Sequence, residues 1–321
     1  MTPSGPMVRP ERHSRSSLPR LAPISNLDLD VTERCNLRCI YCFKGAKGER
    51  DMPLSVGKAA VDWLMEASGD TTDLQINFMG GEPLLCFREL LAPLVQYGHR
   101  KARSLGKAIT FTATTNLTLV TQEMVDLWDR FNCGWLCSID GTPEIQNAQR
   151  PFAGGGGSAS EAERGARLIL RTRPHLSVRS TIHPSHVKAL AECFRHLIHL
   201  GFPLVIMALS DTHLWSGRKL TLLEEQLEKV RLEITEHLRR GCRAALSGFD
   251  YMISEILLPM REGRDLSPIP MSCGAGRGSA MIDPAGTLWP CHRFNSADRD
   301  TGATGAHSLG NLHGEFKDSL Q

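Results

Sequence analysis

The stretch Leu27-Asp-Leu-Asp-Val31-Thr-Glu-Arg-Cys35-Asn-Leu-Arg-Cys39-Ile-Tyr-Cys42 combines a short β-type run with three cysteines that directly follow it. The run predicts a strand, which places the cysteines on the loop at its carboxyl end. Functional groups of βα barrels gather on such loops, so three thiolates there can converge on one ion or cluster. Three cysteines cannot all be paired as disulfides, and thiolates are the usual ligands of iron–sulfur clusters. The spacing therefore predicts a metal site.

Outward from this motif, short β-type runs alternate with longer helical stretches, which predicts βα units around a parallel sheet in an α/β fold. The expected strands cover 27–31, 74–79, 108–114, 134–139, 177–182 and 204–209. The expected helices include 54–67, 84–104 and a long charged helix over 220–246. We place a domain boundary near Ser247, where Pro and Gly become frequent.

Composition and charge restrict the class of protein. Apolar residues make up 41% and charged residues 22% of the chain, and the net charge is +2, as in ordinary soluble globular proteins. There is no basic excess and no apolar run of membrane-spanning length, so neither a nucleic-acid partner nor a membrane is expected. The ten cysteines lie in a long chain without a secretory signal pattern, which favours a reducing, cytoplasmic setting.

The spacing C-x3-C-x2-C, with an aromatic residue before the last cysteine, resembles the signature of the radical S-adenosylmethionine superfamily. The resemblance implies a partial (β/α)6 TIM-like barrel, which we expect over residues 27–247. From its composition of Arg, Ser and Pro, the segment 1–26 is expected to be a disordered tail or the result of a misplaced start at Met1. The resemblance also implies a [4Fe–4S] cluster held by Cys35, Cys39 and Cys42, with one iron open to S-adenosylmethionine. Tyr41 is then expected to lie against the adenine of this cosubstrate.

A second motif, Met79-Gly80-Gly81-Glu82-Pro83, follows the second expected strand and resembles the GGEP segment of the same superfamily. Glycines let a backbone approach a ligand closely, and a carboxylate accepts hydrogen bonds from an ammonium group. We therefore expect Gly80, Gly81 and Glu82 to bind the cosubstrate, with Glu82 at its methionyl amine. Taken alone, Gly-Gly before Pro is more typical of a turn.

Weaker matches end the third and fourth expected strands, at Asn116 and at Ser138-Ile-Asp140-Gly. By resemblance, Asn116 belongs to the cosubstrate site, Ser138 and Asp140 contact the ribose or methionyl part, and Arg150 pairs with the carboxylate. The alternative is structural: Asp140 starts a turn, Asn116 caps the next segment and Arg150 is a solvated surface charge.

Cys273 and Cys291 form a C-x12-G-x4-C pattern in the last region. The pattern resembles the opening of the SPASM extension of peptide- and protein-modifying superfamily members, in which cysteines ligate auxiliary iron–sulfur clusters. We expect residues 248–321 to form a small, incomplete SPASM/twitch-like extension, with Cys273 and Cys291 as metal ligands. No cysteine follows His292, which predicts a truncated sequence, and two cysteines are too few for a four-ligand cluster.

The resemblances predict an enzyme that cleaves S-adenosylmethionine to a 5′-deoxyadenosyl radical and abstracts hydrogen from a peptide or protein, as in maturation of a ribosomally synthesised peptide. A flavodoxin or ferredoxin is the expected reductant. One alternative is an anaerobic sulfatase-maturating enzyme. Those enzymes carry an Asp after the second extension cysteine, where this chain has His292, the candidate catalytic base. Another alternative is a nonenzymatic, metal-containing peptide-binding scaffold.

Overall fold

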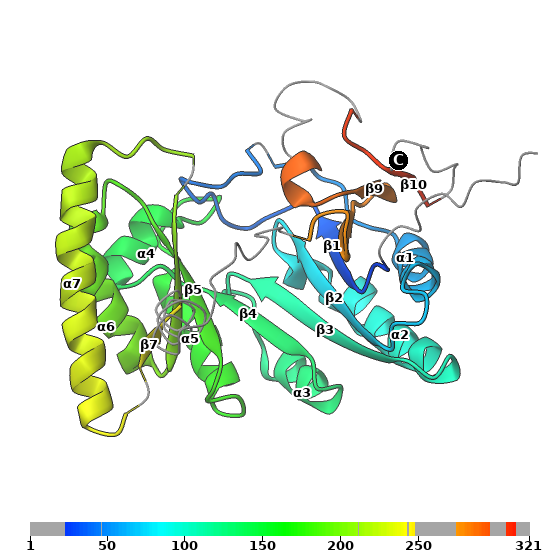
Figure 1. Ribbon diagram of the computed structural model, residues 1–321, viewed down its shortest axis with the longest axis horizontal. Coiled ribbons are helices and arrows are strands. Elements are labelled where there is room, and N and C mark those ends of the chain that lie inside the picture. The colour runs from blue at the N-terminus through cyan, green and yellow to red at the C-terminus, as the bar shows by residue number, and fades with distance from the viewer. Residues whose placement is uncertain are drawn as a thin grey trace, which may run out of the picture.

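The computed structural model describes residues 23–45, 47–210, 212–242, 244–247, 274–295 and 306–312. The strands in these residues form one sheet in the order β10-β9-β8-β1-β2-β3-β4-β5-β6-β7. Figure 1 shows α1 and α7 at opposite ends of the molecule, with the loop after β1 crossing above the sheet between them.

The six central strands confirm the expected βα architecture, because each pairs in parallel with the next. They are β1 (Asn26–Thr32), β2 (Asp73–Gly80), β3 (Ala108–Thr115), β4 (Gly134–Ser138), β5 (Ser177–Ile182) and β6 (Leu204–Leu209). The sheet also contains four short strands that were not expected from the sequence. They are β7 (Ala245–Leu246), β8 (Ser279–Ile282), β9 (Thr287–Trp289) and β10 (Gly310–Asn311).

Helices connect the central strands, and none of those described is both long and apolar enough to cross a membrane. They are α1 (Leu54–Ala67), α2 (Ala92–Ser104), α3 (Gln122–Arg130), α4 (Pro143–Gln149), α5 (Ala159–Leu170), α6 (Leu190–Leu200) and α7 (Gly217–Arg239), with the short turn η3 (Val187–Ala189) before α6. The expectation of α1 over 54–67 is confirmed.

The single helix expected over 84–104 is wrong. The segment is divided into a 3₁₀ turn η1 (Pro83–Cys86), a π turn η2 (Phe87–Leu91) and then α2. Pro93 explains the interruption, because it has no N–H and its ring would collide with the carbonyl four residues earlier in a continuous helix.

The long helix expected over 220–246 is also wrong in its bounds, since α7 begins at Gly217 and ends at Arg239. Gly241 has a φ of +72°. Its N–H donates to the carbonyl of Leu238 at 3.0 Å, and the N–H of Cys242 donates to that of His237 at 2.9 Å. This left-handed cap ends the helix, and the chain then forms β7 beside β6.

The two faces of the central strands differ in polarity. One face carries buried side chains such as Leu29, Phe78 and Phe111, which pack in the apolar core between sheet and helices. The other face carries Asp28 and Asn77, which line a cavity. The interior of a filled TIM barrel is packed with branched apolar side chains. Here polar side chains on the inner face line a cavity instead, which can take a ligand.

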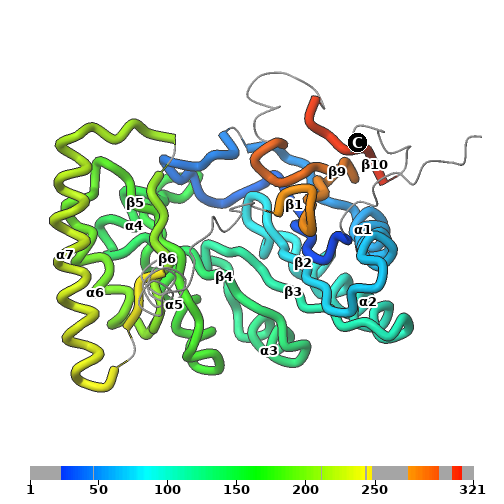
Figure 2. Tube along the Cα trace, in the orientation of Figure 1, coloured from blue at the N-terminus to red at the C-terminus, as the bar shows by residue number. Residues whose placement is uncertain are grey.

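The last described region continues the sheet of the barrel. β8 pairs in parallel with β1, and Figure 2 shows the orange β8–β9 segment next to the blue strand β1. β9 pairs antiparallel with both β8 and β10. The division of the chain at 247 stays a prediction.

Candidate functional site

A cavity of about 350 Å³ lies where the carboxyl ends of the parallel strands meet. Most of the expected site residues lie in its wall: Cys35, Cys39, Tyr41, Cys42, Gly80, Gly81, Glu82, Asn116, Ser138, Arg150 and His292. Asp140 and Cys291 are not part of this wall, and Cys273 lies outside the described residues. Segments far apart in the sequence thus converge on one space.

The cysteine loop (residues 33–51) is closed at its base by an ion pair. The Nε of Arg34 donates to Asp51 at 2.9 Å, and the N–H of Met52 donates to the carbonyl of Val31 at 2.9 Å. These contacts return the chain to β1, so the loop between them projects over the cavity.

The three thiols of this loop are free, and two of them receive hydrogen bonds. The N–H of Leu37 donates to Cys35 Sγ at 3.4 Å, and Lys47 Nζ donates to Cys42 Sγ at 2.7 Å. Burial raises the pKa of Cys35 to about 11, so binding a metal as thiolate would release its proton.

The thiols fit an iron–sulfur cluster better than a single ion. In the described part of the chain, no three Cys, His or carboxylate side chains are grouped closely enough to hold one metal ion. Thiolates of a cluster bind different irons and need not meet at one point. Cys35, Cys39 and Cys42 all face the cavity, and donors near their sulfurs offset thiolate charge.

Gly80 and Gly81 allow the end of β2 to pack against the cysteine loop. A Cβ on Gly81 would overlap the carbonyl of Arg34, and Gly80 has a φ of +136°. The N–H of Gly81 donates to the carbonyl of Thr32 at 2.7 Å, and that of Glu82 to Arg34 at 2.9 Å. The glycines thus permit contact between two loops, while their contact with the cosubstrate stays a prediction.

Glu82 is a buried carboxylate, 1% exposed, that accepts three hydrogen bonds. Its Oε1 accepts from the N–H of Leu84 at 3.1 Å and from Thr115 Oγ1 at 2.8 Å, and its Oε2 accepts from the N–H of Asn116 at 2.8 Å. Burial raises the pKa of Glu82 to about 7 although these bonds oppose it. Each carboxylate oxygen can accept two bonds, so Oε2 keeps one position for an ammonium group.

Asn116 links β3 to the cysteine loop. Its Nδ2 donates to Asn36 Oδ1 at 2.9 Å, and its Oδ1 accepts from the N–H and the hydroxyl of Thr118 at 3.0 and 2.7 Å. Asn36 Nδ2 also donates to the Thr118 hydroxyl at 2.8 Å. These bonds favour the structural alternative for Asn116, and its contact with the cosubstrate stays a prediction.

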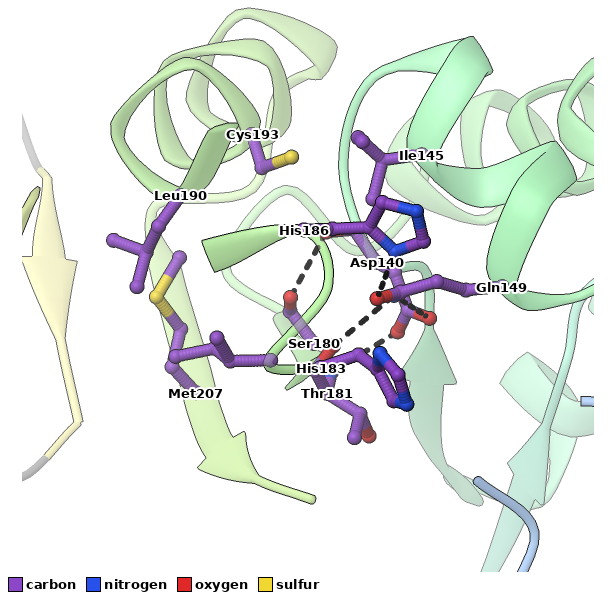
Figure 3. Close-up of a pocket in the computed structure, with 11 residues that line it drawn as sticks. Asp140, Ile145, Gln149, Ser180, Thr181, His183, His186, Leu190, Cys193 and Met207 are labelled. Carbon is purple, nitrogen blue, oxygen red and sulfur yellow. Dashed lines mark hydrogen bonds between the residues drawn. The ribbon is translucent and has the colours of Figure 1, made fainter. Parts of the chain in front are cut away.

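Asp140 lies behind the wall, and four donors surround its carboxylate. Figure 3 shows two of them, from Gln149 and Thr181. Its Oδ1 accepts from Arg150 Nη2 and the N–H of Thr181, both at 3.0 Å. Its Oδ2 accepts from Gln149 Nε2 at 2.7 Å and from the Tyr41 hydroxyl. The carboxylate is therefore saturated, and it can support the cosubstrate through Arg150 and Tyr41. Its direct contact with the cosubstrate stays a prediction.

Arg150 is buried, 7% exposed, which makes the alternative of a solvated surface charge wrong. Burial disfavours its cation, but the carboxylate of Asp140 outweighs this and raises the pKa of Arg150 well above its ordinary value. Its Cζ lies 5.4 Å from the centre of the Tyr41 ring. Its Nε is buried and has no hydrogen-bond partner among the described residues, so the guanidinium can still take an anionic ligand group.

The β8–β9 turn positions the residues after Cys291. The Oδ1 of Asp283 accepts from the N–H groups of Ala285 and Thr287 at 2.9 and 3.0 Å, and its Oδ2 accepts from Trp289 Nε1 at 3.0 Å. Asp283 is only 8% exposed, so these bonds organise the turn from within. They hold the strand from which the chain proceeds to the cavity.

His292 lies in the wall, with its Nδ1 3.6 Å from Oδ2 of Asp28, and its catalytic role stays a prediction. The ring of His292 also lies 5.2 Å from that of Phe43, between centroids. Cys291 is a free thiol of intermediate exposure. Its role as a ligand, together with that of Cys273, stays a prediction.

Other wall residues were missed by sequence reasoning: Asp28, Lys44, Lys47, Asn77, Thr114 and Arg179. Two of them carried a detectable signal, because Asp28 and Asn77 each stand between apolar residues of a strand. Alternation in a parallel sheet marks strands whose second face is not packed. Lys44 and Lys47 lie on an irregular loop, where no periodicity points to the cavity.

A comparison with protein families agrees with this geometry. The model of the Radical SAM superfamily matches residues 29–202, and the chain belongs to that superfamily. Members bind a [4Fe–4S] cluster and S-adenosylmethionine, for which the three thiols, Glu82 and Arg150 provide suitable groups.

Known relatives share this region at low identity. An uncharacterised protein of Methanocaldococcus jannaschii is 29% identical over 178 residues, 56% of this chain and 60% of its own. A PqqA peptide cyclase of Granulibacter bethesdensis is 24% identical over 85% of this chain and 68% of the cyclase. A cysteine-type anaerobic sulfatase-maturating enzyme of Clostridium perfringens is 24% identical over 84% of this chain and 75% of that enzyme. The chain spans 44% to 62% of the length of the first three curated relatives.

Solved structures share the fold. The anSMEcpe structure with bound AdoMet has a TM-score of 0.75 at 20% identity, over 93% of this chain and 80% of that one. Streptococcus suis SuiB bound to its precursor peptide SuiA has a TM-score of 0.66 at 15% identity, over 94% of this chain and 66% of SuiB. At such identities the likeness concerns the fold alone.

Proposed function

We propose that this protein is an enzyme that reductively cleaves S-adenosylmethionine and abstracts a hydrogen atom from a peptide or protein substrate. The observation that carries the proposal is the convergence of three thiols, a buried carboxylate and a buried guanidinium on one cavity. This set matches the charges of a cluster and of an amino-acid cosubstrate.

Each group has a distinct task in this proposal. Cys35, Cys39 and Cys42 hold the cluster, which when bound supplies the electron that splits S-adenosylmethionine into methionine and a 5′-deoxyadenosyl radical. The free position on Glu82 takes the ammonium of the cosubstrate, and Arg150 takes its carboxylate. Tyr41, fixed through Asp140, orients the adenine. The cysteine loop over the cavity restricts water, so the chain supplies position and shielding.

A peptide substrate is supported by apolar side chains near the cavity. Leu209 lines the wall and is 46% exposed, while Ile40 (43% exposed) and Phe294 (37%) adjoin wall residues in sequence. Leu214, on the loop after β6, is 98% exposed. Exposed apolar groups near a polar cavity suit an extended peptide, and the relatives include a peptide cyclase and a sulfatase-maturating enzyme. Maturation of a ribosomally synthesised peptide is the form of the reaction that we favour.

Formylglycine formation on a sulfatase is a second candidate, favoured by the place of His292 in the wall beside Asp28. A base next to the substrate could accept the proton of a Cys or Ser side chain. A hydrazine probe distinguishes the two candidates, because it traps the aldehyde of formylglycine and does not label a peptide with a carbon–carbon or thioether crosslink.

The test is anaerobic reconstitution with iron and sulfide, followed by reductant and S-adenosylmethionine. We expect 5′-deoxyadenosine from the native protein and none above background from the variant with Cys35, Cys39 and Cys42 all changed to Ala. Cys242→Ala, at an exposed free thiol, is the matched control and should retain activity. Equal product from the triple variant, or none from a folded, iron-loaded native protein, would contradict the proposal and favour a binding scaffold.

A further inference from the structure

The cavity wall contains five Lys and Arg side chains, and four of them have a described contact. Lys44 forms an ion pair with Asp30, Lys47 donates to Cys42, Arg150 pairs with Asp140, and Arg293 lies over the ring of Phe43. Arg179 is the fifth. Its side chain forms no ion pair or hydrogen bond with any other residue that the structure describes, and it is exposed to the cavity.

The position of Arg179 in β5 explains why it has no anion beside it. In the sheet register it lies opposite Ser138 of β4 and Ile206 of β6, and neither side chain carries a negative charge. The next inward-facing residue along β5 is Thr181, which is also neutral. A guanidinium whose neighbours in the sheet are neutral provides five N–H donors for a ligand.

Arg179 lies deeper along its strand than the network that holds Arg150, although its β4 neighbour Ser138 is itself an expected cosubstrate contact. The N–H of Thr181 binds Asp140, which holds Arg150, so this network marks the carboxyl end of β5. Arg179 precedes Thr181 by two residues, which puts it about 7 Å deeper in the barrel along the strand. An anion bound there would lie deeper in the barrel than the network that holds Arg150.

We propose that Arg179 is a substrate-binding residue that pairs with the carboxylate of an acidic side chain, Asp or Glu, of the peptide substrate. The inference rests on the proposed function, because it requires a peptide in the cavity. The pairing fixes the register of the peptide relative to the cosubstrate, and a bidentate guanidinium–carboxylate contact is well suited to this. The protein would therefore select peptides with an acidic residue near the modified position.

The experiment is a selection from a displayed random peptide library, made anaerobically on reconstituted full-length protein with S-adenosylmethionine. The native protein should enrich peptides rich in Asp and Glu, Arg179→Gln should lose this preference, and Arg179→Glu should reverse it towards Lys and Arg. Arg171→Glu makes the same change of charge at an exposed residue after α5, outside the cavity wall, and should select as the native protein does. Iron content and melting temperature establish that each variant is folded.

A double-mutant cycle on one enriched peptide measures the interaction energy between Arg179 and the acidic residue of the peptide. Replacing its acidic residue by the amide should weaken binding to the native protein about tenfold and leave binding to Arg179→Gln nearly unchanged. Equal losses in both proteins, or enrichment of peptides without acidic bias, would overturn the role of Arg179 and leave the peptide function standing. If the native protein enriches no peptide at all, the proposed peptide substrate fails as well.

Discussion

Glu82 combines two demands on one side chain. Its three hydrogen bonds hold together η1 and the end of β3, and the residue lines the cavity with one acceptor position left. Burial brings its pKa from 4.5 to about 7, so the carboxyl group ionises within the physiological range. In the free protein, its contribution to stability is largest when it is protonated and falls as the pH rises from about 4.5 to 7.

The affinity for S-adenosylmethionine should instead rise with pH, because the ammonium group of the cosubstrate pairs with the ionised carboxylate of Glu82. Between pH 6 and 8 we expect the affinity for S-adenosylmethionine to rise about tenfold in the native protein. Glu82→Gln should bind weakly at every pH, and its amide would leave the N–H of Asn116 without an acceptor, at a cost in stability of about 1–3 kcal/mol.

Anaerobic equilibrium dialysis at each pH, with urea unfolding in parallel, measures both effects. Glu66→Gln, at an exposed position on α1, is the matched control and should keep the native pH dependence. An affinity that falls with rising pH, or the same slope in Glu82→Gln, would show that another group controls binding.

The sequence predicted which residues belong to the site better than it predicted their surroundings. Motifs found Asp140 and Arg150, but they could not show that four donors occupy Asp140 or that Arg150 is buried. The first fact depends on Tyr41 and Thr181, which come from other segments of the chain. Arg179 was missed because it belongs to no motif, and only its inward position on β5 identifies it.

At the scale of elements, the cysteine loop and the end of β2 form one unit. Gly81 lies so close to the backbone of Arg34 and Cys35 that any side chain there would displace the cysteine loop. The thiols and Glu82 are therefore positioned by the same contact. A change at this contact should disturb the cluster site and the cosubstrate site together.

Gly81→Ala tests this coupling. We expect a loss of stability of about 1–3 kcal/mol from overpacking, together with reduced iron content after reconstitution. Gly154→Ala is the matched control, because a Cβ at that loop position meets nothing within 4 Å, and it should change stability by less than about 0.5 kcal/mol. Urea unfolding and iron analysis provide the two readouts. Normal iron content in Gly81→Ala would mean that the cysteine loop is positioned independently.

The bounds of the elements show which sequence signals are reliable. β5 and β6 coincide with their expected ranges, since each is a short β-type run with turn residues nearby in the sequence. The helix over 84–104 failed because apolar spacing continued through Pro93, and the helix over 220–246 failed because Gly241 was not recognised as a cap. In both cases one backbone constraint outweighed the side-chain pattern.

At the scale of the whole molecule, the last described region shares the sheet of the barrel. β8 adds to the edge of β1, and Ile282 of β8 is as fully buried as Ile76 of β2. The sequence could not reveal this, because β8 to β10 are only two to four residues long and β8 pairs with β1, far away in the chain. Such strands are defined by their partners more than by their own composition.

We therefore expect barrel and extension to unfold as one cooperative unit. Ile282→Ala should lower the single thermal transition much as Ile76→Ala does, each by about 2–5 kcal/mol of unfolding free energy. Differential scanning calorimetry of the two variants gives the comparison. A second transition that shifts only in Ile282→Ala would show that the extension unfolds by itself.

The side-chain bridge between Asn36 and Asn116 has a consequence for the behaviour of the protein in air. Oxygen that destroyed the cluster would release the three thiols and loosen the cysteine loop. Because Asn36 binds both Asn116 and Thr118, the loosening would extend to the end of β3. Damage at the metal would then appear as faster exchange of backbone amide hydrogens more than 70 residues along the chain from the thiols.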